Sequence, residues 1–211
     1  MEIYVFGSIT SGDVDAGSDV DVLAIVEAEE TRALPNHWSV YRRERIHQLF
    51  AQGTLFAWHL HKDARLVFPC DREGLIESLG QPAPYLRAEQ EIEMLMHIAR
   101  DACRELAAGT PSPVYELGLL FVASRDVAMA AAPYLSAEFV FSRFAPYGLQ
   151  TPSYPLDRSD YEVLMACRRA STRGGAFELA ADALQRLAGR AENILAWLHD
   201  VKRRVNECKP S

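Results

Sequence analysis

The pattern of apolar residues changes at Gly80–Pro84 (GQPAP), and this change constrains the fold of the chain more than any other feature. Before it, the apolar residues form short runs rich in β-branched and aromatic side chains, which are typical of strands. After it, they recur every three or four residues, as on one face of a helix. We therefore expect an α+β chain of two domains: a small mixed sheet in residues 1–84 and an all-α helical bundle in residues 85–211.

Two strands are expected near the N-terminus, at Glu2–Phe6 and Val20–Val26, with a turn-rich segment between them. Asp19 and Asp21 lie at the start of the second strand, and alternation places both on one side of it. Further along, the pattern predicts a helix over 38–52, a third strand over 54–61, a short strand over 65–68 and a small helix over 71–79.

The apolar pattern of residues 85–211 predicts helices. They are expected over 89–106, from Pro113 to about Ala131, from a cap at Ser136 to Pro146, and from a capping box at Ser159 to Gly174. The last helix has the longest apolar stripe, which suits a bundle. Its members are Phe177, Ala180, Leu184, Leu187, Ala191, Ile194, Leu198, Val201 and Val205.

The charge of the chain is concentrated at its beginning. The net charge is −7, and residues 1–31 hold eight acids and no Lys or Arg. Extended nucleic-acid binding needs a basic face, so it is not expected. Clustered carboxylates repel one another unless a cation separates them, and a divalent ion is one natural counter-charge.

Cysteine spacing and hydropathy indicate the compartment. The four cysteines form no CxxC pair, and no basic n-region of a signal peptide is visible. The longest apolar stretches are too short to cross a bilayer, so no membrane partner is expected. These features predict reduced thiols and a cytoplasmic protein.

The chemistry is expected where Gly7-Ser8 follows the first strand and Asp19-Val20-Asp21 begins the second. A glycine after a strand lets the backbone approach a ligand, and adjoining N–H groups and a Ser hydroxyl can bind phosphate oxygens. Two carboxylates on one strand face supply the hard oxygen ligands that Mg²⁺ prefers. Two such ions can activate a hydroxyl and stabilise leaving pyrophosphate.

The segment FGSITSGDVDAGSDVDVLAIV resembles the signature of the DNA polymerase β-type nucleotidyltransferase superfamily in its minimal form. The matching residues are Phe6, Gly7, Ser8, Gly12, Ser18, Asp19, Asp21 and Val22. The resemblance implies that Gly7, Ser8 and Ser18 bind the nucleotide triphosphate and that Asp19 and Asp21 ligate Mg²⁺. Asp13 and Asp15 are better explained as solvated turn residues.

One family feature is missing. Active members carry a third carboxylate on a later strand, and the matching stretch here, TLFAWHLHKDARLVF, contains no acid before Asp63. On a strand, His59 and His61 would share one face, where either could act as base or ligand. They could equally be sheet residues, one half-buried and one exposed. Asp63 could serve if the strand continues through it.

The basic cluster Arg42, Arg43 and Arg45 has two interpretations. It could contact phosphates, or it could form a solvated helix face, which is the commoner role of such clusters.

The layout of a sheet domain followed by helices is similar to kanamycin nucleotidyltransferase and to pairings with HEPN domains. HEPN ribonucleases carry an Arg followed four to six residues later by His. Arg125 has Ala-Ala-Ala at 130–132 instead, so RNase activity is not predicted.

Two functions follow from these features. The first is Mg²⁺-dependent transfer of a nucleoside monophosphate from an NTP, with ATP expected, to a hydroxyl of a small molecule or protein, catalysed by Asp19 and Asp21 with His59 or Asp63. The second is a catalytically weak nucleotide-binding regulatory or antitoxin-like module, for which a homodimer is one form. The missing third acid favours the second.

Overall fold

The computed structural model describes residues 1–12, 20–27, 34–69, 73–174 and 177–208. The chain divides into two compact units. The first comprises Met1–Arg87 together with Phe141–Arg143, and the second comprises Ala88–Val140 and Phe144–Ser211. The first unit contains a sheet and the second is helical, which confirms the predicted α+β class.

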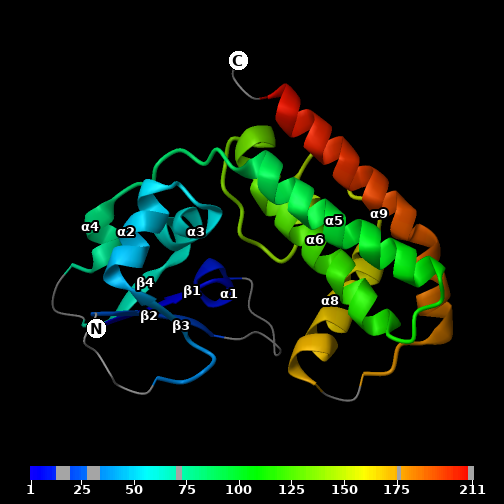
Figure 1. Ribbon diagram of the computed structural model, residues 1–211, viewed down its shortest axis with the longest axis horizontal. Helices are drawn as coiled ribbons and strands as arrows, with labels where there is room; N and C mark the ends of the chain where they lie inside the picture. Colours follow the sequence, from blue (N-terminus) through cyan, green and yellow to red (C-terminus); the bar gives the residue numbers. More distant parts are fainter. Residues whose placement is uncertain (13–19, 28–33, 70–72, 175–176, 209–211) are drawn as a thin grey trace. The chain divides into compact units, whose positions relative to one another are not determined.

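The first unit is built on a four-stranded mixed sheet (Figure 1). Its strands are β1 (Glu2–Phe6), β2 (Asp21–Val26), β3 (Ser39–Arg42) and β4 (Arg65–Phe68), in the order β3-β2-β1-β4. Strand β1 is antiparallel to both of its neighbours, whereas β3 runs parallel to β2. The register pairs Phe6 with Asp21, which sets the end of β1 beside the start of β2.

Helices pack on the sheet. They are α1 (Ser8–Ser11), α2 (Arg43–Ala51), α3 (Leu55–Asp63) and α4 (Leu75–Leu79). Tyr4, Leu23 and Ile25 alternate onto one sheet face and are buried with Ile46 of α2 and Leu60 of α3. This two-layer core fixes α2 and α3 against the strands that carry the Gly-Ser turn and Asp21.

Two predictions in this unit are wrong. Residues 39–42 are a strand rather than the start of a helix, because they pair with β2, a contact that local sequence does not reveal. Residues 55–63 are helix α3 rather than a strand. The Thr54 side chain caps this helix by accepting from the Ala57 N–H at 3.2 Å, and short apolar runs do not distinguish helix from strand.

The second unit is a helical bundle. Its helices are α5 (Ala88–Ala107), α6 (Pro113–Leu135), α7 (Ala145–Gly148), α8 (Arg158–Arg173) and α9 (Ala181–Glu207). Helix α6 packs against α5, α8 and α9, and α5 also packs against α9. Gly118 of α6 permits close approach of α8, since a Cβ there would lie 3.0 Å from the Arg168 Cα. None of the described helices is long and apolar enough to cross a membrane.

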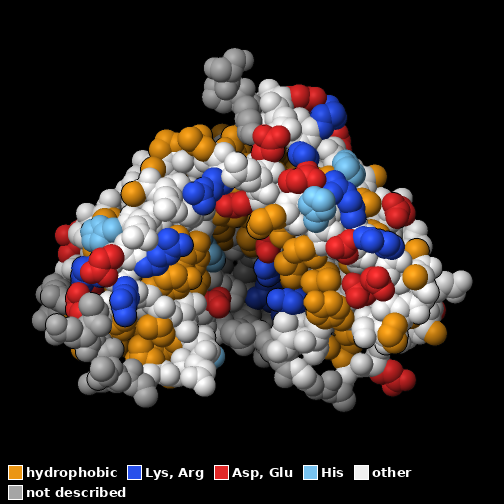
Figure 2. Space-filling view, in the orientation of Figure 1, with side chains coloured by type: hydrophobic (Ala, Val, Ile, Leu, Met, Phe, Trp, Pro, Cys, Tyr) orange, Lys and Arg blue, Asp and Glu red, His pale blue; other side chains and the backbone are white. Residues whose placement is uncertain are grey.

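Ion pairs join the exposed sides of the bundle. Glu93 of α5 pairs with Lys202 of α9 and with Arg100 of its own helix. Acidic and basic side chains alternate over the visible face of these helices (Figure 2). This face therefore has no broad area of a single charge. Among the described cysteines, Cys103, Cys167 and Cys208 are free thiols.

Several helix ends in the bundle differ from the predictions; α9, for example, begins at Ala181 and so leaves out Phe177 and Ala180. Helix α6 continues through Pro133 to Leu135. No helix begins at Ser136, and the short α7 instead contains Pro146 in its first turn, where a missing N–H costs no helical hydrogen bond. Asp157 rather than Ser159 caps α8, by accepting from the Asp160 N–H at 2.9 Å.

Candidate active site

The site begins at the turn that follows β1. Gly7 has φ +73° and ψ −145°, a backbone conformation that favours glycine. The turn is closed by Thr10, whose N–H and hydroxyl donate to the Gly7 carbonyl at 3.1 and 2.9 Å. The short helix α1 starts at Ser8, so the Gly-Ser pair stands where the strand ends.

Asp21 lies directly against this turn. A Cβ built on Gly7 would lie 2.4 Å from Asp21 Oδ2, a distance that real Cβ atoms do not tolerate. Asp21 is exposed, whereas Leu23, two residues further along β2, is fully buried. The structure thus brings the predicted Gly7 and Asp21 together, and Asp21 is an exposed residue.

The other motif residues that were expected to bind nucleotide or metal lie outside the described residues. Ser18 and Asp19 fall in the segment 13–19, as do Asp13 and Asp15. Their roles therefore stay predictions. Among the residues that are described, no group of three or more His, Cys, Asp or Glu side chains is arranged to hold a metal.

Among the described residues, no strand beside β1 or β2 carries a third carboxylate. The strands that flank β2 and β1 are β3, with sequence SVYR, and β4, with sequence RLVF, and neither contains an acid. The stretch expected to supply this strand is largely helix α3, so that expectation is wrong. Asp63 ends α3 and is buried, with 8% of its surface exposed.

The helical geometry also separates the two histidines. Side chains two residues apart on a helix are rotated by about 200° about the helix axis. His59 and His61 therefore cannot share a face as predicted. His61 is exposed and lies edge-on to Trp58, with ring centroids 6.0 Å apart. His59 points the other way and meets Asp63, one turn further along α3, with Nε2 3.4 Å from Oδ2.

His59 contacts two aromatic rings. Its imidazole is edge-on to Phe6, with centroids 5.4 Å apart, and stacks on Phe141 at 4.3 Å with an interplanar angle of 19°. Phe6 immediately precedes Gly7. No local pattern in the sequence signals the Phe141 contact, because Phe141 lies far from His59 along the chain.

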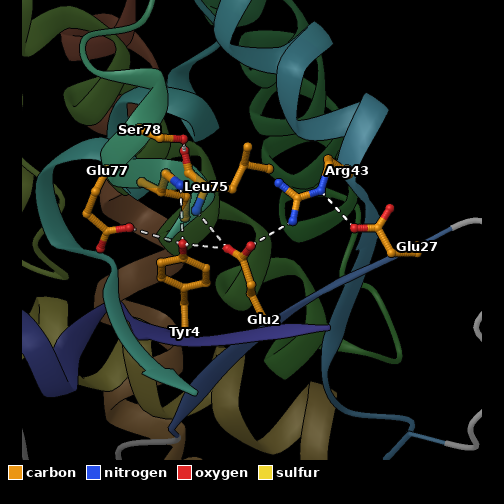
Figure 3. A network of polar contacts seen from close by, with 8 residues as sticks. Glu2, Tyr4, Glu27, Arg43, Leu75, Glu77 and Ser78 are labelled. Atoms are coloured by element: carbon orange, nitrogen blue, oxygen red, sulfur yellow. Dashed lines mark hydrogen bonds and ion pairs between the residues drawn. The ribbon is translucent and has the colours of Figure 1, made fainter. Parts of the chain in front are cut away.

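A buried polar network lies at the other end of the sheet (Figure 3). The Glu2 carboxylate accepts from the Leu75 N–H at 2.7 Å, from the Arg43 guanidinium at 2.7 Å and from the Tyr4 hydroxyl at 3.0 Å. Burial alone would raise the pKa of Glu2, but these hydrogen bonds outweigh it and hold the pKa below its ordinary value. Burial raises the pKa of Tyr4.

Two arginines of the basic cluster have protein partners. Arg43 binds Glu2 and also donates to Glu27 at 2.9 Å, so its guanidinium ties α2 to the strands. Arg45 donates to Gln48 on the exposed side of α2. Sequence reasoning missed this network, although an acid that alternates with Tyr4 and Phe6 on one strand face is a signal of a buried charge with a partner.

The first part of the chain is similar to a known family. The family model described as "Nucleotidyltransferase domain" matches residues 1–76. Among solved structures, the chain resembles spectinomycin adenyltransferase from Enterococcus faecialis, crystallised with ATP and spectinomycin. The identity is 10%, the TM-score is 0.44, and the match covers 93% of this chain and 91% of the other. No curated protein matches the sequence. The match over residues 1–76 agrees with the nucleotidyltransferase resemblance that the Gly-Ser and Asp motif carries.

Proposed function

We propose that this chain transfers a nucleoside monophosphate from ATP to a hydroxyl group of an acceptor and releases pyrophosphate. The observation that supports this most directly is the contact of Asp21 with Gly7. It places the carboxylate of an exposed acidic residue beside a glycine, which has no side chain of its own. A triphosphate can approach such a turn closely, because nothing projects from Gly7.

The domain family implies Mg²⁺, and the donors on this chain fit that ion. Asp21 offers carboxylate oxygens, which are the ligands Mg²⁺ prefers, and a side chain at Gly7 would fill the space next to them. We assign Asp21 and Asp19 to hold the metal. When bound, Mg²⁺ neutralises phosphate charge and stabilises the leaving pyrophosphate.

The protein groups have separate tasks in this proposal. The Gly7 backbone and the hydroxyls of Ser8 and Ser18 bind phosphate oxygens and orient the triphosphate. Asp21 and Asp19 supply the negative charge that a metal–nucleotide complex requires. The acceptor is a small molecule with hydroxyl groups or a protein side chain.

The test measures transfer from ATP labelled at the α-phosphate in the presence of Mg²⁺. The acceptor panel contains aminoglycosides, spectinomycin and whole protein extract, and Asp21→Asn is compared with the wild type. A loss of about 100-fold or more is expected for Asp21→Asn, because the metal loses a charged ligand. Glu44→Gln, at an exposed acid on α2 of the same unit, is the control and should transfer at the wild-type rate. Equal transfer by wild type and Asp21→Asn contradicts the proposal.

A second candidate is a module that binds nucleotide without turnover. The absence of an acid from β3 and β4 favours it. In that case, calorimetry should detect Mg²⁺-dependent ATP binding that Asp21→Asn abolishes, while pyrophosphate release stays at the buffer rate. Measurable release by the wild type would exclude it. A homodimer belongs to this alternative, and light scattering measures it directly.

A further inference from the structure

Nucleotidyl transfer requires a group that takes the proton of the attacking hydroxyl. No described strand next to β1 or β2 supplies an acid for this task. We propose that His59, oriented by Asp63, is the proton acceptor of this site, and that a histidine–aspartate pair on helix α3 replaces the missing third carboxylate. This inference rests on the function proposed above and assigns one further role within it.

The pair is built by one turn of helix. His59 and Asp63 are four residues apart on α3, so their side chains lie on the same face. Nε2 of His59 lies 3.4 Å from Asp63 Oδ2 and is buried, with no hydrogen-bond partner among the described residues. After a small rotation of the ring, His59 Nε2–H would donate a hydrogen bond to Asp63 Oδ2.

Part of the His59 side chain remains exposed. Its exposed fraction is 21% although Nε2 is buried, so atoms of this side chain other than Nε2 reach solvent. With Nε2–H directed at the carboxylate, the lone pair is on Nδ1 and can accept a proton. This is the arrangement expected of a base with an orienting acid.

Phe6 connects the pair to the Gly7–Asp21 contact. The Phe6 ring touches His59, and Phe6 is the register partner of Asp21 on the adjacent strand. Cross-strand partners point to the same sheet face, with Cβ atoms about 4.5–5.5 Å apart. The imidazole is thus one aromatic side chain away from the proposed metal ligand.

Phe141 stacks on the imidazole ring of His59. It is 9% exposed and belongs to the short segment Phe141–Arg143, which the contacts group with the sheet rather than with the helices that precede and follow it. Parallel stacking at 4.3 Å restricts rotation of the imidazole plane. Phe141 and Asp63 are positioning residues in this proposal, and His59 is the group that meets the acceptor.

The proposed reaction forms one bond, breaks one bond and transfers one proton. The acceptor oxygen forms a bond to the α-phosphorus, and the bond from that phosphorus to the bridging oxygen breaks, so that pyrophosphate leaves with the electron pair. The hydroxyl proton moves to Nδ1 of His59. The imidazolium that forms is stabilised by the Asp63 carboxylate, and it later releases the proton to water.

The first experiment compares transfer rates of the full-length variants with labelled ATP, Mg²⁺ and the acceptor panel. His59→Ala should lower the rate about 100- to 10,000-fold, the range for loss of a general base. Asp63→Asn should lower it about 10- to 100-fold, as for other groups that orient a histidine. His61→Asn, at the exposed histidine on the same helix, is the control and should keep the wild-type rate.

A chemical rescue separates proton transfer from packing. Imidazole added to His59→Ala should restore transfer, because it can take the place of the deleted ring beside Phe6 and Phe141 and accept a proton. Thiazole has nearly the same shape but is a far weaker base, so it should not restore transfer. Equal rescue by both compounds, or a wild-type rate in His59→Ala, overturns the proposal.

A measurement without turnover tests the orientation. Long-range ¹H–¹⁵N spectra of the wild type should show the His59 tautomer with the proton on Nε2, and Asp63→Asn should alter it. A proton on Nδ1 in the wild type overturns the proposal. If the wild type transfers nothing to any acceptor, the proposed function itself fails, whereas equal transfer by wild type and His59→Ala contradicts the role of His59 alone.

Discussion

The carboxylate of Asp21 occupies the space that a side chain on Gly7 would need. The Cβ of any other residue at position 7 would lie 2.4 Å from Oδ2, on a backbone with φ +73°. The pairing of Phe6 with Asp21 creates this contact, because it brings the end of β1 beside the start of β2. One register therefore positions both the glycine turn and the acid.

Gly7→Ala should abolish Mg²⁺-dependent nucleotide binding. The new methyl group must displace the Asp21 carboxylate, and the backbone conformation itself costs about 1–3 kcal/mol in a residue other than glycine. Calorimetric titration with ATP and Mg²⁺ measures the effect, and thermal unfolding measures the loss of stability.

Gly80→Ala is the matched control for Gly7→Ala. Gly80 has φ 64° and ψ −144°, nearly the conformation of Gly7, but no atom lies within 4 Å of the position that a Cβ on Gly80 would take. We expect a similar loss of stability with nucleotide binding intact. If both variants lose binding equally, backbone strain rather than the Asp21 contact explains the effect.

Glu2→Gln should lower stability at neutral pH by about 1–3 kcal/mol, because the buried hydrogen bonds lose their charge. The folded pKa of Glu2 is lowered, so the carboxylate contributes its full stability above the ordinary value of 4.5 and loses it as the pH falls through the folded pKa. Urea unfolding across this range should therefore show wild type and variant converging below pH 4.5.

Glu27→Gln is the control for the pH experiment. Glu27 binds the same Arg43, but its side chain is 58% exposed. Its removal should change stability little at any pH. A wild-type pH dependence that persists in Glu2→Gln would assign the acid sensitivity to other carboxylates.

Thr54→Ala should destabilise the first unit by about 1 kcal/mol, because the Ala57 N–H loses its capping acceptor. Thr54→Ser keeps the hydroxyl and should retain most of the stability. Urea unfolding compares the two variants. Equal losses would show that the Thr54 methyl group, and not the cap, stabilises α3.

Asp160→Ala should destabilise the helical unit by about 1.5–3 kcal/mol, the range for hydrogen bonds to charged groups. Asp160 is 2% exposed and accepts from Arg186 Nε at 2.9 Å and Arg190 Nη1 at 3.2 Å. Asp182→Ala removes an 81% exposed partner of the same Arg186 and should change stability little. Unfolding midpoints that shift equally in both variants would contradict this ranking.

Local sequence predicted the elements that long patterns or specific turn residues define. The strands over residues 2–6 and 21–26, the long helices α5 and α9, and the contact between the Gly-Ser turn and Asp21 follow from such patterns. A periodic pattern over many residues predicts a helix even where single positions are ambiguous. A glycine directly after a strand predicts a turn, because few other roles fit a glycine there.

Shorter segments were decided by contacts between residues distant in the sequence. Residues 39–42 became a strand because β2 was available as a parallel partner, and the short apolar run from Leu55 became a helix with a cap and a buried face. A run of about eight residues fits either form, so its own propensity did not decide the outcome.

The sequence by itself determined which chemical groups this protein places at the end of its first strand. Only the tertiary structure decided what surrounds them: the Phe141 ring on His59, the Asp63 carboxylate beside it, and the Glu2–Arg43 pair that ties α2 to the sheet. The physical reason is that a motif is local in the chain. Packing, burial and charge pairing depend on which distant residues folding brings within a few ångströms.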